Sequence, residues 1–143
     1  MPLSDDHSIE HHALRFINLT LPKSEWTHEG HFAAALWVLR NRPDLAAPDE
    51  FRRLVIRYNE MTDTPNNDSG GYHHSITSAS LCAAASHLRD LAPNVPLHAV
   101  LQSLMDSPLG RTDWLLSYWR KETLFSVAAR KAWVEPDVGP LPF

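Results

Sequence analysis

The sequence contains one cysteine, three lysines and no long apolar run. A single cysteine, Cys82, excludes an internal disulfide and therefore a secreted scaffold that depends on disulfides. No apolar run reaches the roughly 18 residues that a membrane-spanning helix requires. The first residues are acidic and polar, and they lack the basic and apolar regions of a signal peptide. We therefore expect a cytoplasmic protein without a membrane partner.

The chain also lacks an excess of positive charge. It has 13 lysine and arginine residues against 17 aspartate and glutamate residues, a formal net charge of −4. A surface that binds the phosphates of nucleic acids needs a basic face, so we expect no nucleic-acid partner. Hydrophobic residues make up 43% of the 143 residues, which is typical of a single soluble domain. Cys82 itself lies in the apolar run 81–85, and we expect it to be buried as a small hydrophobic residue.

Alternation of apolar and polar residues with a period of two is absent, which argues against strands. We expect an all-α fold in which residues 1–143 form one helical domain, a bundle of six or seven helices with an extended, proline-rich C-terminal tail. Thr27 and Ser126 are good N-caps, and residues 62–72 contain mainly turn-forming residues. The expected helices cover residues 8–19, 28–41, 48–61, 73–91, 96–105, 112–119 and 126–133.

The sequence is rich in histidine, with nine residues, and histidine is the commonest metal ligand in proteins. His28 and His31 lie three residues apart on an expected helix, where two imidazoles can reach one cation. The pair is not the zinc-protease motif HExxH, because the second histidine of that motif follows at i+4. Glu29 is therefore not assigned a catalytic role.

A second group of histidines begins the expected helix 73–91. Tyr72, His73 and His74 follow two glycines, and consecutive helical positions differ by about 100° in direction. We therefore expect one of the two histidines to face the core and the other to flank it. His28, His31 and His73 are the expected ligands of a divalent transition metal, with zinc, iron, copper, nickel and manganese all compatible with imidazole nitrogen.

Other residues complete the expected site. His74 is either a fourth ligand or an acid–base group, and Tyr58 and Glu60 are candidate catalytic groups that can orient or exchange protons with metal-bound molecules. The expected substrate pocket lies between the helices 28–41 and 73–91. Its candidate lining residues are Trp26, Tyr72, Thr77 and Asp137.

Two functions remain open from the residues alone. One is a metal-dependent enzyme that activates water or a small-molecule substrate, by hydrolysis, lyase chemistry or oxidation. The other is a non-catalytic module that binds a small molecule or a metal in an aromatic-lined pocket. The exposed face expected for the first helix, with Ile9, Leu14 and Ile17, could form a homodimer. His7, His11 and His12 near the N-terminus are expected on the surface.

Two motifs resemble those of a family of small bacterial all-helical proteins. Residues 26–32, WTHEGHF, match an aromatic-x-His-x-x-His pattern, and residues 71–77, GYHHSIT, look like the second motif, Gly-x-Tyr-His-Glu-Thr-x-Thr. The segment 125–142 is similar to the C-terminal part of the same family. The resemblance implies a site built on His28, His31 and His73 and brings no established reaction with it. His74 and Ser75 stand where that family usually carries Glu and Thr, so this site would differ from the family's if that Glu is a ligand or base.

Overall fold

The structure, a computed structural model, describes residues 3–143, and in this range the chain forms helices and no strand. The predicted all-α class is therefore confirmed. The seven α-helices are α1 (Asp6–Ile17), α2 (His28–Asn41), α3 (Pro48–Met61), α4 (His74–Asp90), α5 (Leu97–Asp106), α6 (Lys121–Leu124) and α7 (Val127–Lys131). Four short 3-10 helices connect them: η1 (Lys23–Glu25), η2 (Pro43–Ala46), η3 (Pro108–Gly110) and η4 (Trp114–Ser117).

Helix starts follow the capping signals in the sequence. The Thr27 side chain accepts a hydrogen bond from the Gly30 backbone N–H, and the Ser126 side chain does the same for Ala129. The predicted bounds of α2 and α3 are confirmed.

The predicted helix over 112–119 is wrong, because a 3-10 helix of four residues takes its place. The C-terminal segment supplies backbone partners there: the Tyr118 carbonyl accepts from the Val138 N–H at 2.8 Å, and the Asp137 carboxylate accepts from the Arg120 N–H at 2.8 Å. Tertiary partners thus replace the bonds that a continuing helix would have made.

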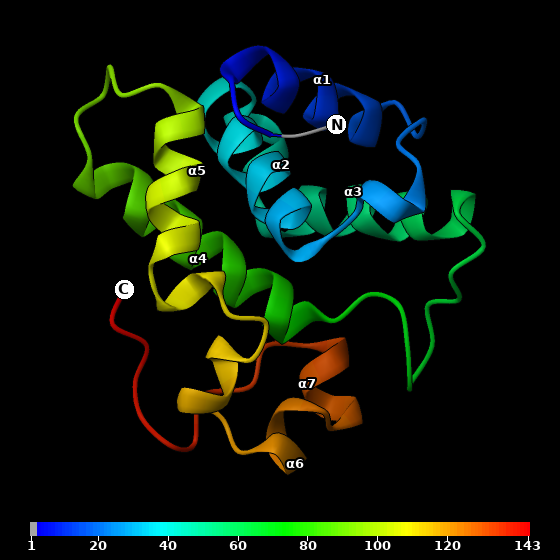
Figure 1. The fold of residues 1–143 in the computed structure, drawn as a ribbon. Helices are drawn as coiled ribbons and strands as arrows, with labels where there is room; N and C mark the ends of the chain where they lie inside the picture. Colours follow the sequence, from blue (N-terminus) through cyan, green and yellow to red (C-terminus); the bar gives the residue numbers. More distant parts are fainter. Residues whose placement is uncertain (1–2) are drawn as a thin grey trace.

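Helix α4 runs through the middle of the fold (Figure 1). Helices α1, α2 and α3 lie on one side of it and α6 and α7 on the other, while α5 lies beside α4 and α2. Helix α2 is buried along most of its length because it contacts α1, α4 and α5 together. None of the helices within residues 3–143 combines the length and apolar character needed to cross a bilayer.

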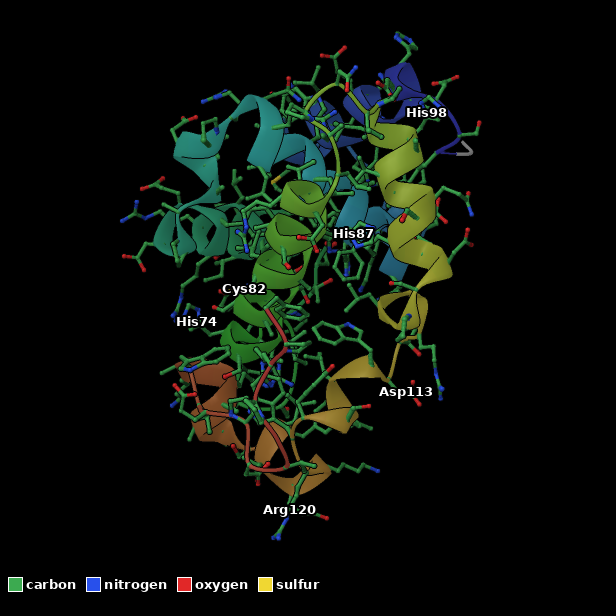
Figure 2. The ribbon with its side chains drawn as sticks, turned by 90° about the vertical axis from the view of Figure 1, so that its left-hand side faces the viewer. His74, Cys82, His87, His98, Asp113 and Arg120 are labelled. Atoms are coloured by element: carbon green, nitrogen blue, oxygen red, sulfur yellow. The ribbon has the colours of Figure 1, made fainter. Side chains whose placement is uncertain are left out.

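Three expectations about burial are wrong. His12 is 2% exposed, because α1 and α2 approach closely at Gly30 and the His12 Nε2–H donates to the Gly30 carbonyl at 2.9 Å. Cys82 is exposed on α4, whose buried face at this point carries Leu81 and Ala83 instead (Figure 2). Ile9 is fully buried, so the expected dimer face on α1 cannot include it.

Candidate functional site

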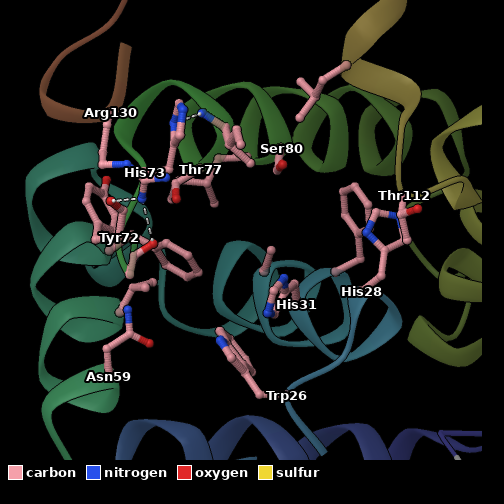
Figure 3. Close-up of a pocket in the computed structure, with 18 of the residues that line it drawn as sticks. Trp26, His28, His31, Asn59, Tyr72, His73, Thr77, Ser80, Thr112 and Arg130 are labelled. Carbon is pink, nitrogen blue, oxygen red and sulfur yellow. Dashed lines mark hydrogen bonds between the residues drawn. The ribbon is translucent and has the colours of Figure 1, made fainter. Parts of the chain in front are cut away.

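The structure contains a cavity of about 610 Å³ that is open to solvent and lined by α2, α3, α4 and the segment around η4 (Figure 3). Its volume lies in the range of small-molecule sites. Much of the lining is apolar or aromatic, and those residues include Trp26, Phe32, Phe51, Val55, Tyr58, Tyr72, Ile76, Trp114, Leu115 and Phe125.

Most of the residues predicted for the site lie around this cavity. Seven of them line it: Trp26, His28, His31, Tyr58, Tyr72, His73 and Thr77. The other three lie outside its lining. Glu60 is exposed on α3, His74 is half-buried beside Tyr72, and Asp137 hydrogen-bonds Thr123 and the Arg120 backbone in the C-terminal segment.

Sequence reasoning missed other lining residues. Ser80 lies seven residues after His73 on the same face of the helix, and this spacing could have placed it at the cavity. Thr112 reaches the cavity from the connection before η4, on the same side of the view as His28 in Figure 3. No local pattern marks Thr112, because its position depends on how α5 and η4 pack against α2.

Two of the three predicted metal ligands bind backbone carbonyls with a ring nitrogen. The His73 Nε2–H donates to the Leu124 carbonyl at 2.6 Å, and the His28 Nε2–H donates to the Leu109 carbonyl at 2.8 Å. His73 is also the N-cap of α4, since its Nδ1 accepts from the Ile76 N–H at 3.1 Å. His73 is therefore held in the neutral tautomer protonated on Nε2, and burial lowers its pKa.

His31 differs from these histidines because its ring has no hydrogen-bond partner among the described residues. Its ring centroid lies 4.3 Å from that of Trp26, and it opens onto the cavity (Figure 3). The His31 side chain is exposed to solvent, although the protein around it still removes part of the ring's hydration. Desolvation, with smaller contributions from His28 and His12, lowers the pKa of His31 to about 4. At neutral pH the ring is therefore uncharged and offers one donor and one acceptor.

The polar groups near the start of α4 already have partners. The Tyr72 hydroxyl donates to His74 Nδ1 at 2.8 Å and is also hydrogen-bonded by Thr77, while burial raises its pKa to about 12. Arg130 donates to the carbonyls of Gly71 and Tyr72, both at 3.2 Å. Gly71 adopts φ +78°, and an added Cβ would lie 2.4 Å from the Pro65 carbonyl oxygen, so the turn before α4 requires glycine. These hydrogen-bonding groups at the start of α4 are therefore already paired within the protein.

The predicted metal site does not fit these donors. A ligating imidazole needs one unprotonated nitrogen free for the metal, and both nitrogens of His73 are used within the protein. Residues 3–143 contain no group of three or more His, Cys, Asp or Glu side chains arranged to hold a metal ion.

Elemental analysis tests this disagreement directly. We expect protein purified without a nickel column to contain well under one equivalent of transition metal, because His28 and His73 are committed to carbonyls. Adding zinc is expected to leave the melting temperature unchanged. Stoichiometric metal that disappears in both His28→Ala and His73→Ala would instead establish the predicted site.

The arrangement is suited to holding a molecule. Aromatic walls surround a volume of about 610 Å³, and one uncharged imidazole, His31, presents free hydrogen-bonding atoms to it. At the start of α4, Tyr72 is hydrogen-bonded to His74, and His73 is hydrogen-bonded to the backbone of Leu124 and Ile76. No family model, curated protein or solved structure was found to match the chain.

Proposed function

We propose that the protein binds a small, mainly apolar organic molecule in the cavity between α2, α3 and α4. The observation that carries this proposal is the cavity itself, which has about 610 Å³ of space and aromatic side chains on several walls. Sites for small organic molecules have volumes of about 300–1,000 Å³ and are mostly apolar with few polar groups. The cavity is open to solvent, so such a molecule can enter it without unfolding the helices.

Packing behind the walls supports binding without large rearrangement. The Trp26 ring is stacked on Phe16 with centroids 4.4 Å apart and planes at 11°, and its centroid lies 5.1 Å from that of Tyr58. The Tyr58 hydroxyl donates to the Leu21 carbonyl at 3.0 Å. These contacts fix the aromatic wall before a ligand arrives, which reduces the entropy lost on binding.

Filling the cavity is expected to abolish binding. Ser80→Phe places a large ring in the cavity, whereas Cys82→Phe places the same ring on the exposed side of α4. We expect the uncharged fluorescent probe N-phenyl-1-naphthylamine to bind the wild type and Cys82→Phe with one site and similar affinity. Ser80→Phe should weaken this binding at least about tenfold, which corresponds to about 1.4 kcal/mol.

Fluorescence titration measures the affinity, and circular dichroism checks that both variants remain helical. Failure of the probe to bind the wild type would contradict the proposed function. Equal probe binding by Ser80→Phe and the wild type would place the binding elsewhere on the protein and would also contradict it.

A further inference from the structure

His31 is the cavity histidine that the protein leaves without a hydrogen bond. His28 and His73 also line the cavity, and each uses Nε2 on a backbone carbonyl, at 2.8 and 2.6 Å. His12, which lies behind Trp26, does the same with Gly30 at 2.9 Å. No described residue does this for His31, although its ring is held against Trp26 with centroids 4.3 Å apart. The His31 side chain is exposed at the cavity, so a ligand there can hydrogen-bond the ring without first breaking a bond within the protein.

The charged side chains of the lining argue for an uncharged partner. Arg130 donates to two backbone carbonyls, and Asp113 is paired with Arg111 at 3.2 Å. Lys23 is exposed to solvent. A charge carried into the cavity would lose hydration, and an anion could pair only with the solvated Lys23, whereas a neutral polar group avoids most of this cost.

The position of Trp26 adds a requirement of shape. Its indole ring is packed on Phe16 and is tilted against His31 by 58°. A flat ring can contact this wall over a large area, and aromatic contacts prefer offset-stacked or edge-to-face arrangements. A polar group at the edge of such a ring would then lie near the free imidazole nitrogens.

Resting on the proposed function, we infer that the cavity takes an uncharged, planar ring compound that bears a hydroxyl or amide group. That group hydrogen-bonds the His31 imidazole, and the ring packs against Trp26. The neutral imidazole can donate to an oxygen or accept from an O–H or N–H, so it serves either group. Ser80 and Thr112 add hydroxyls to the same cavity without changing its charge (Figure 3).

Displacement of bound N-phenyl-1-naphthylamine by three compounds with the same ring system tests this inference. We expect 2-naphthol to bind about five- to tenfold more tightly than naphthalene, because one hydrogen bond contributes about 1 kcal/mol. We expect 2-naphthoate to bind at least about tenfold more weakly than 2-naphthol, because its charge would lose hydration and could pair only with the solvated Lys23. In His31→Phe the ratio between 2-naphthol and naphthalene should fall to within about twofold, with naphthalene binding retained.

A second variant separates the loss of the hydrogen bond from a general loss of structure. His31→Gln keeps one donor and one acceptor, and it should preserve the preference for 2-naphthol. Equal affinity of 2-naphthol and naphthalene for the wild type, an unchanged ratio in His31→Phe, or tightest binding of 2-naphthoate would each overturn the inference while the proposed function stands. Failure of the probe itself to bind the wild type overturns both.

Discussion

Replacing His73 with alanine is expected to lower the free energy of unfolding by about 3 kcal/mol. The variant loses the N-cap of α4, where His73 Nδ1 accepts from the Ile76 N–H, and such a loss costs about 1 kcal/mol. It also leaves the Leu124 carbonyl without its partner at 2.6 Å, and an unsatisfied buried acceptor costs about 1–3 kcal/mol. Urea unfolding followed by circular dichroism measures the change.

Two variants separate these contributions. His73→Asn keeps a good N-cap residue but is too short to reach Leu124, so we expect it to recover about 1 kcal/mol of the loss. His11→Ala changes an exposed histidine on α1 and should shift stability by less than about 0.5 kcal/mol. A wild-type stability in His73→Ala would mean that the cap and the carbonyl bond contribute nothing.

The helices could be predicted from sequence because their signals are local. Thr27 precedes the apolar face of α2, and Pro48 with two carboxylates begins α3, so the bounds of both helices follow from neighbouring residues. The C-terminal third could not be predicted in the same way. Its backbone bonds, such as that between Val138 and Tyr118, join segments whose approach depends on the whole fold.

The position of the cavity could be predicted from the sequence, but the hydrogen-bond partners of its histidines could not. Helical spacing places His28, His31 and His73 around one space, which is where the structure has them. Their partners are carbonyls 81 residues away for His28 and 51 residues away for His73. Every residue carries a carbonyl, so no residue type in the sequence marks the partner. An imidazole that binds a carbonyl and one that binds a metal therefore look alike until the fold is known.

The same histidines predict a loss of stability in weak acid. Burial lowers the pKa of His12, His73 and His31 in the folded protein, to about 4 for His31, while the unfolded chain has the ordinary value near 6.5. The unfolded chain therefore binds more protons at pH 5, and acid favours unfolding. The stability contributed by these groups is present above about pH 6.5 and is lost as the pH falls toward the folded values. In His73 the incoming proton would also occupy the nitrogen that caps α4.

We expect the free energy of unfolding to fall by roughly 2–4 kcal/mol between pH 7 and pH 4.5, with His31 contributing less than its full shift because water reaches its ring. Urea unfolding at half-unit pH steps measures this slope.

Hydrogen bonds also lower the pKa of Asp5, through Ser8, and of Glu25, through Arg15, but the stability that these carboxylates contribute is lost only near and below pH 4. His31→Phe cannot take up a proton and should have a shallower slope than the wild type. A flat profile down to pH 4.5 would show that the buried imidazoles accept protons without opening the fold, and that their hydrogen bonds to the backbone do not hold it together.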